Sequence, residues 1–216
     1  MGPEVKICGL MRPEDAAVAG SAGADYVGVI FADSRRRVAA DRGREILDGA
    51  SAYAARRVGV FGASDGDAIL QTATTARVDV LQLHGGFDAT EVSYLRRNFS
   101  GTLWGVVRVP PKGIDAEDWA RWDEVDAVVV DTWTLGALGG TGVPFDWVTA
   151  AAALSALRGK RPIVLAGGLT PENVASGMAT LTPDVVDVSS GVERIPGEKD
   201  PARIAAFVRA VRGESP

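Results

Sequence analysis

The sequence predicts an α/β protein that folds as a single (βα)8 TIM barrel with eight parallel strands. Three observations point to this fold class. β-rich runs alternate with helical runs along the chain, the β-rich runs are dense in Val, Ile and Leu, and two glycine-rich turns follow the last two of them. Parallel strands joined by helical crossovers are buried on both faces, so their sequences are apolar throughout rather than alternating. The 216 residues divided among eight βα units give about 27 residues each, which is compact for this fold.

The expected elements follow one another in strict strand–helix order. The strands, each a short run rich in β-branched residues, are Val5–Cys8, Tyr26–Phe31, Arg57–Phe61, Val80–Leu83, Leu103–Val109, Ala127–Val130, Ile163–Leu165 and Val185–Val188. The helices are expected near 13–22, 40–55, 66–77, 88–98, 115–122, 145–158, 171–179 and 200–212. Several begin with a proline at the first helical position, as at Pro13, Pro171 and Pro201, where its missing N–H costs nothing.

The rival architecture is a doubly wound open sheet, which is also built from βα units. It usually needs fewer strands for this length, and it carries a glycine fingerprint in its first turn. That fingerprint is absent here, and no linker or shift in composition divides the chain. We therefore expect one catalytic domain over residues 1–216.

Composition excludes several classes of function. Apolar residues make up 46% of the chain, and 23 basic residues against 28 acidic ones give a net charge of −5. Nucleic acid is a poor partner for such a chain, which has no basic run to follow a phosphate backbone. No apolar run reaches the length of a membrane span, and the first residues leave no room for a signal peptide. A single cysteine, Cys8, fits a reducing compartment, so we expect a cytoplasmic protein.

The two glycine-rich turns predict a site for an anion. Gly167 and Gly168 follow the seventh expected strand, and Ser190 and Gly191 follow the eighth. Glycine lets backbone N–H groups approach an anion closely, and such turns form a nest of donors. In (βα)8 barrels, the loops after strands seven and eight commonly hold phosphate. The sequence therefore predicts a phosphorylated small molecule as substrate.

Two further strand ends could carry chemistry at the same mouth of the barrel. Cys8 ends the first strand and Asp131 follows the sixth. A thiol and a carboxyl group on opposite sides of a barrel could act as base and acid on one substrate. Each also has a structural interpretation: a lone cysteine on an apolar strand is often a core residue, and an aspartate after a strand often caps a turn. The residues alone leave both interpretations open.

Other polar residues near the mouth are less specific. The arginines 35–37 form either a solvated loop or, with one side chain turned inward, a bidentate partner for a carboxylate. His84 is either a hydrogen-bonding residue at a strand end or part of the site. Gly142 ends a glycine-rich loop, which is either a third contributor to anion binding or simply flexible. With one histidine and no Cys/His cluster, a zinc site is not expected.

Together these segments resemble the phosphoribosylanthranilate isomerase family from end to end. The matching segments are KICGL at 6–10, DYVGVIF and SRRRV within 25–38, VGVF at 58–61, LQLHG at 81–85, VVVDT at 128–132, GGTG and FDW within 139–147, LAGGLTPENV at 165–174, and DVSSGVE and PGEKD within 187–200. The resemblance implies a TIM barrel that catalyses an Amadori rearrangement in tryptophan biosynthesis. It also implies no metal and no organic cofactor. We expect a monomer or homodimer, and the sequence does not decide between the two.

The resemblance also implies roles for individual residues. Cys8 would be the general base, Asp131 the general acid, and Arg36 the partner of the anthranilate carboxylate. The remaining substrate-binding residues are Gly142, Gly167, Gly168, Ser190 and Gly191 at the phosphate, with His84 and Asp187 in support. This chain departs from the family in one respect: Arg35 stands where the family usually has proline, which makes Arg37 an alternative to Arg36.

Two other functions remain as alternatives at this stage. The aminoaldose isomerase of histidine biosynthesis is also a phosphate-binding barrel, but its family uses two aspartates, which argues against it because the first position here is a cysteine. The third hypothesis is a barrel that binds a phosphorylated metabolite without turning it over.

Overall fold

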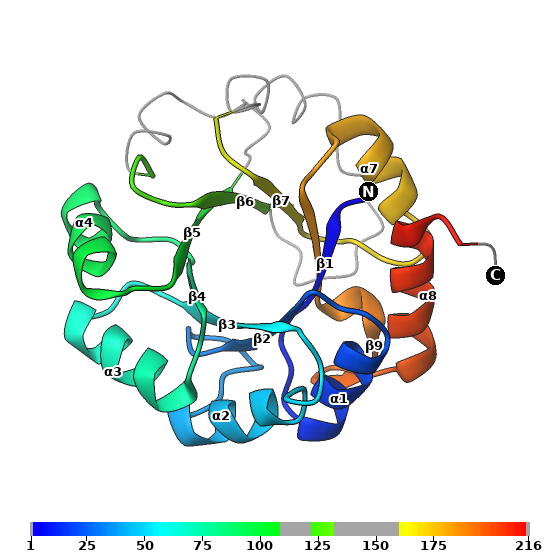
Figure 1. Cartoon of the computed structure of the whole chain (residues 1–216), viewed down its shortest axis with the longest axis horizontal. Coiled ribbons are helices and arrows are strands. Elements are labelled where there is room, and N and C mark those ends of the chain that lie inside the picture. The colour runs from blue at the N-terminus through cyan, green and yellow to red at the C-terminus, as the bar shows by residue number, and fades with distance from the viewer. Residues whose placement is uncertain (1, 109–121, 132–159, 215–216) are drawn as a thin grey trace.

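The computed structural model describes residues 2–108, 122–131 and 160–214, which form a closed barrel of eight parallel strands (Figure 1). This confirms the predicted fold class. The strands pair in chain order, and the last pairs with the first. They are β1 Glu4–Ile7, β2 Tyr26–Ile30, β3 Arg56–Phe61, β4 Val80–Leu83, β5 Thr102–Arg108, β6 Ala127–Asp131, β7 Ile163–Ala166 and β8 Val185–Val188.

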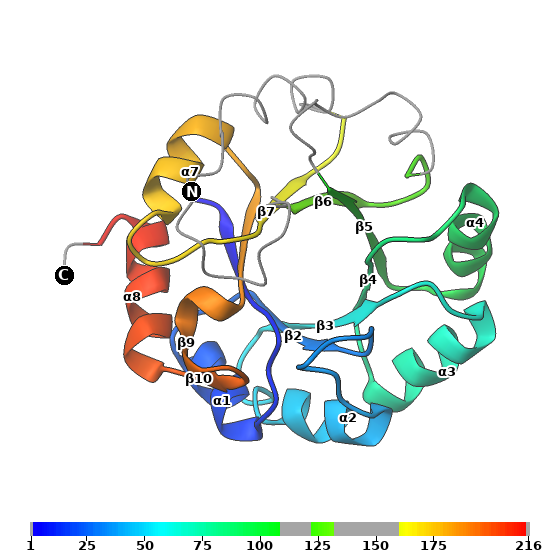
Figure 2. The ribbon, with the colours of Figure 1, turned by 180° about the vertical axis from the view of Figure 1, so that it is seen from behind.

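The described helices form a ring outside the barrel, as Figure 2 shows from the other end. They are α1 Pro13–Ser21, α2 Ala40–Asp48, α3 Gly66–Ala76, α4 Ala89–Asn98, α7 Val174–Leu181 and α8 Pro201–Arg212. A 3₁₀ turn, η1 (Ser190–Val192), follows β8 and leads into a short hairpin of β9 (Glu193–Ile195) and β10 (Glu198–Lys199). The hairpin was not predicted from the sequence.

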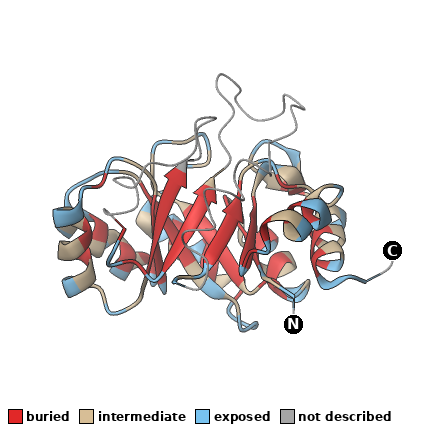
Figure 3. Ribbon diagram, turned by 90° about the horizontal axis from the view of Figure 1, so that it is seen from above, coloured by how far each residue is buried: buried red, intermediate tan, exposed pale blue. Residues whose placement is uncertain are grey.

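The strands are buried on both faces (Figure 3). Successive side chains of a strand lie on opposite faces. On β1, Val5 and Ile7 therefore point outward to the helices, and Lys6, which lies between them, points into the barrel. The pairing register places Lys6 of β1 level with Tyr26 and with Asp187 on its two neighbours. The barrel interior therefore carries polar groups among its apolar layers.

Two helix boundaries differ from the prediction. α2 ends at Asp48 rather than at residue 55, since Gly49 disfavours helix and the chain then continues in turns. α7 begins at Val174 rather than at residue 171. The side chain of Asn173 accepts the N–H of Thr170 at 2.8 Å, and such local bonds compete with helix formation. The helix expected at 145–158 lies outside the described residues, as does nearly all of that expected at 115–122.

Candidate active site

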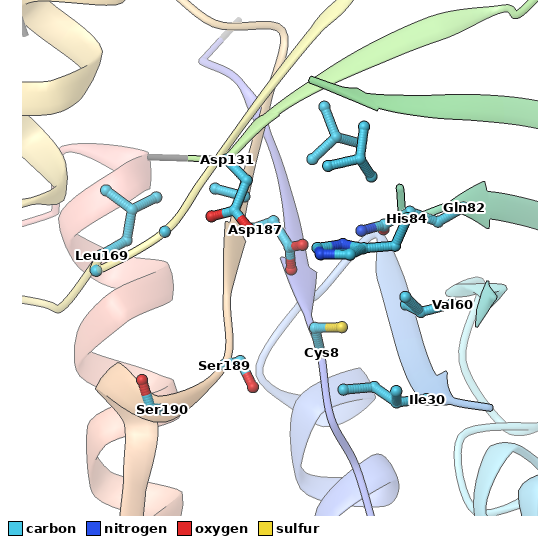
Figure 4. Close-up of a pocket in the computed structure, with 15 residues that line it drawn as sticks. Cys8, Ile30, Val60, Gln82, His84, Asp131, Leu169, Asp187, Ser189 and Ser190 are labelled. Carbon is cyan, nitrogen blue, oxygen red and sulfur yellow. The ribbon is translucent and has the colours of Figure 1, made fainter. Parts of the chain in front are cut away.

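A cavity of about 220 Å³ opens at the carboxyl ends of the strands. Its lining brings together most of the side chains that the sequence singled out (Figure 4). The lining residues are Cys8, Ile30, Val60, Gln82, His84, Val106, Val129, Asp131, Ala166, Gly167, Gly168, Leu169, Asp187, Ser189 and Ser190. Gly191 and Arg36 do not line it, and Gly142 lies outside the described residues.

The barrel geometry explains why these residues meet. Cys8 directly follows β1, whereas Asp131 is the last residue of β6. Both point into the barrel, because every second side chain of a strand lies on the same face. Cys8 follows the inward residue Lys6 by two positions, and Asp131 follows the inward residue Val129 by two positions. Figure 4 shows the side chains of Asp131, Asp187 and His84 pointing into one space beside the sulfur of Cys8. A thiol and a carboxyl group thus face a shared cavity across the barrel mouth.

Cys8 is buried, with 6% of its surface exposed, yet its side chain borders the cavity. Its backbone N–H donates to the carbonyl of Val188 at 2.9 Å, which continues the β1–β8 ladder and fixes the position of the thiol. Burial raises the pKa of the Cys8 thiol, while the ammonium groups of Lys6 and Lys199 act to lower it. The residue is therefore both part of the core and accessible from the mouth.

A buried ion pair lies directly below the thiol. The ammonium of Lys6 is 2.7 Å from Oδ2 of Asp187, and both residues are buried. Oδ1 of Asp187 has no hydrogen-bond partner among the described residues, and neither has Oε1 of Gln82. Both residues border the cavity. Buried polar atoms are normally paired, so these two oxygens are available to polar groups of a ligand.

Arg36 lies beside the cavity and is held by an acidic residue. Its Nε and Nη2 each donate to an oxygen of Glu193 at 2.6 Å. Glu193 also accepts from the buried ammonium of Lys199 at 3.2 Å. A Cβ added at Gly9 would lie 2.7 Å from Cδ of Arg36, so the glycine makes room for the arginine stem. Arg37, the alternative, borders a separate cavity with Phe31.

The two glycine-rich turns pack directly against each other. Gly167 and Gly168 have φ angles of 90° and 65°, which an L side chain rarely adopts. A Cβ added at Gly191 would lie 1.9 Å from the carbonyl oxygen of Leu169. The side chain of Asn173 donates to the carbonyl of Gly168 at 2.9 Å and braces the first turn. Two backbone turns thus form one wall at the mouth, as an anion nest requires.

Sequence reasoning assigned no role to four polar residues near the site: Lys6, Gln82, Glu193 and Lys199. A signal existed for the first two, since Lys6 precedes Cys8 by two residues and Gln82 precedes His84 by two, which places each pair on one face of a strand. Nothing local marks Glu193 as the partner of Arg36, because 157 positions separate them.

Two further observations concern metals and membranes. Among the described residues, no three His, Cys, Asp or Glu side chains come together in a group that could hold a metal ion. Within the same part of the chain, no helix is long and apolar enough to cross a membrane.

Comparison with known proteins gives consistent matches over the whole chain. Residues 5–210 match the family described as N-(5'-phosphoribosyl)anthranilate (PRA) isomerase. The N-(5'-phosphoribosyl)anthranilate isomerase of Rubrobacter xylanophilus is 41% identical, with 97% of this chain and 98% of that protein covered. The crystal structure of phosphoribosyl anthranilate isomerase from Thermotoga maritima superposes with a TM-score of 0.84 at 33% identity, covering 98% of this chain and 99% of that one.

A third similar protein was solved with a ligand. It is phosphoribosyl anthranilate isomerase in complex with reduced 1-(o-carboxyphenylamino)-1-deoxyribulose 5-phosphate, with a TM-score of 0.81 at 31% identity. The match covers 98% of this chain and 99% of that chain.

Proposed function

The chain belongs to the N-(5'-phosphoribosyl)anthranilate isomerase family, and from this we propose how its residues carry out the reaction. The activity is the Amadori rearrangement of N-(5'-phosphoribosyl)anthranilate to 1-(2-carboxyphenylamino)-1-deoxyribulose 5-phosphate, in tryptophan biosynthesis. The observation that carries the proposed mechanism is the cavity that Cys8 and Asp131 border from two sides. An aldose-to-ketose isomerase needs one acid and one base that reach adjacent atoms of one sugar.

The first step opens the ribose ring. Asp131, in its acid form, gives its proton to the ring oxygen, the C1'–O bond breaks, and the anilino nitrogen supplies the electron pair that forms an iminium ion. That cation acidifies the proton on C2'. The thiolate of Cys8 removes this proton, and the electron pair left behind forms an enolamine. The enolamine tautomerises to the aminoketose, so no atoms are gained or lost.

The phosphate anchors the sugar between the two groups. We assign it to the backbone of Gly167, Gly168, Ser190 and Gly191, and to that of Gly142. Binding a phosphate at a distance from the reacting carbons lets its binding energy position the ribose. Because the turn after β7 and the turn after β8 contact each other, they can act as one receptor.

We assign binding of the anthranilate carboxylate, on the aromatic half of the substrate, to Arg36. Glu193 occupies two of its donor nitrogens, but a guanidinium carries five N–H groups. The remaining donors can bind the anthranilate carboxylate, and Lys199 adds a second positive charge beside the shared glutamate. This cluster of two cations and one anion leaves an excess positive charge that favours a carboxylate.

His84 and Asp187 would contact the sugar hydroxyl groups. Both border the cavity, and Oδ1 of Asp187 has no hydrogen-bond partner among the described residues. A hydroxyl group of the substrate would donate the hydrogen bond that this buried oxygen lacks. We further infer a cytoplasmic enzyme of one catalytic domain that works as a monomer or homodimer and needs no metal or organic cofactor.

The test is a fluorescence assay that follows loss of freshly prepared phosphoribosylanthranilate. Its control is the aminoaldose substrate of the histidine pathway, which a barrel with Cys8 at the first strand should turn over far more slowly. Comparable rates on the two substrates would contradict the assignment of specificity. Binding of phosphoribosylanthranilate without any turnover would support the non-catalytic alternative.

A further inference from the structure

Lys6 is a charged residue in the middle of the barrel. It lies on β1 between the apolar residues Val5 and Ile7, and none of its surface is exposed. Lysine is almost never fully buried unless it is paired. Because side chains alternate along a strand, Lys6 points to the same side as Cys8, into the interior, in the layer directly beneath the cavity.

The ammonium of Lys6 lies between a carboxylate and the thiol. It donates to Oδ2 of Asp187 at 2.7 Å, and the sulfur of Cys8 lies on the same side of the strand, two residues further on. Both atoms lie beside Gly28 of β2: a Cβ added there would be in ordinary van der Waals contact with each, 3.5 Å from Nζ of Lys6 and 3.4 Å from the sulfur. The nitrogen and the sulfur thus pack against the same glycine.

A buried ion pair is a weak source of stability, because the cost of removing both charges from water offsets their attraction. An apolar pair of the same volume would serve the barrel core as well. Of the described cations near the sulfur, Arg36 and Lys199 share the neutralising carboxylate of Glu193. Lys6 lies on the strand that leads to Cys8, and its ammonium and the sulfur pack beside the same glycine.

We propose that Lys6 is a positioning residue for the isomerase reaction: its ammonium, anchored on Asp187, stabilises the thiolate of Cys8 that accepts the substrate proton. The inference deepens the function proposed above and rests on Cys8 as the base. A thiol is a poor base unless its environment favours the thiolate. Lys6 opposes the effect of burial from below, so that the face of the sulfur toward the cavity stays open to substrate.

The charges around Cys8 oppose one another. Burial, the largest influence, and the carboxylate of Asp187 raise the pKa of its thiol, whereas the ammonium groups of Lys6 and Lys199 lower it. The net result is a raised pKa, and Lys6 keeps it from rising further. Burial also acts to lower the pKa of Lys6, but the carboxylate and the sulfur outweigh burial and raise it, so the ammonium keeps its proton. Removing Lys6 therefore leaves burial and Asp187 acting together against the thiolate.

Alkylation of Cys8 by iodoacetamide measures the thiolate without any turnover, and the chain has no other cysteine. We expect Lys6→Met to raise the pH midpoint of alkylation by about one unit or more, which equals about tenfold slower alkylation at a fixed pH below the midpoint. The matched control is Val5→Ala, which disturbs the same strand on its outer face. It should leave the midpoint unchanged.

A second variant covers the case in which Lys6→Met does not fold because Asp187 is left unpaired. Lys6→Met/Asp187→Asn removes both charges, and neutral replacement of a buried pair is usually tolerated. Its midpoint should still rise, by less, because the ammonium acts on the sulfur more strongly than the carboxylate does. An unchanged midpoint in whichever of the two variants folds would overturn the inference.

The same variants separate this inference from the proposed mechanism. If Cys8 is the base, the acidic limb of kcat/KM against pH moves with the alkylation midpoint. A shifted midpoint with an unmoved limb would keep the contact between Lys6 and the thiolate but remove Cys8 as the base. That result would overturn the role of Lys6 in catalysis.

Discussion

Gly191→Ala tests whether the two glycine-rich turns act as one phosphate receptor. The added Cβ would lie 1.9 Å from the carbonyl oxygen of Leu169, whereas real Cβ atoms essentially never come closer than 3.0 Å. The two turns must therefore separate by about 1.1 Å. A misplacement of about 1 Å in a positioning element can cost on the order of 100-fold in rate. Because we assign the substrate phosphate to these turns, we expect kcat/KM for phosphoribosylanthranilate to fall by about that factor.

The control is a clash of the same kind at the opposite end of the barrel. Gly101 precedes β5, and a Cβ added there would lie 2.4 Å from the carbonyl oxygen of Asp79, which precedes β4. Gly101→Ala and Gly191→Ala should both lower the free energy of unfolding, by about 1–3 kcal/mol. Urea unfolding measures this loss, and steady-state kinetics measure kcat/KM.

Inorganic phosphate as a competitive inhibitor completes the assay. Gly191→Ala should weaken its inhibition together with the loss of kcat/KM, whereas Gly101→Ala should leave both at the wild-type level. If Gly191→Ala folds and binds phosphate as the wild type does, the turns do not form the receptor and the reasoning is refuted.

Three further predictions concern single side chains. Asp131→Asn should lower kcat by about 100- to 10,000-fold, the usual contribution of a general acid; loss of stability alone would count against it as the acid. Arg36→Ala should weaken binding of the product about tenfold or more by titration, and equal losses for an analogue without the carboxylate would reject that contact. Glu193 has a lowered pKa because Arg36 and Lys199 outweigh the opposing effect of burial. Its contribution to stability is therefore present above about pH 4.3, its usual pKa, and is lost as the pH falls through its lower folded-state pKa. Glu193→Gln should flatten that part of the unfolding free energy against pH, and an unchanged slope would contradict the assignment.

The fold could be predicted because each strand is marked by its own composition. The runs Val80–Leu83 and Val185–Val188 coincide with β4 and β8 as observed. Boundaries were less accurate where side chains bond to the local backbone, as at Thr170 and Asn173 before α7. Propensity does not capture such bonds, because they depend on one particular turn geometry.

The positions of most candidate site residues could also be predicted, since parallel strands deliver their carboxyl ends to one mouth. What the sequence could not reveal is how the charges there are paired. Arg36, which follows β2, meets Glu193, which follows β8, beside the end of β1, and Lys6 meets Asp187 across the junction of β1 and β8. Such pairs form only when the barrel closes and fixes how its strands align with one another. No local sequence pattern therefore predicts them.

The central claim is that the sulfur of Cys8 removes a proton from a sugar held in this cavity. The most direct measurement is the turnover of phosphoribosylanthranilate by the wild type and by Cys8→Ser, with urea unfolding run on both proteins. We predict that Cys8→Ser loses several orders of magnitude in kcat while it still unfolds cooperatively. Near-normal turnover by the folded serine variant would contradict the account.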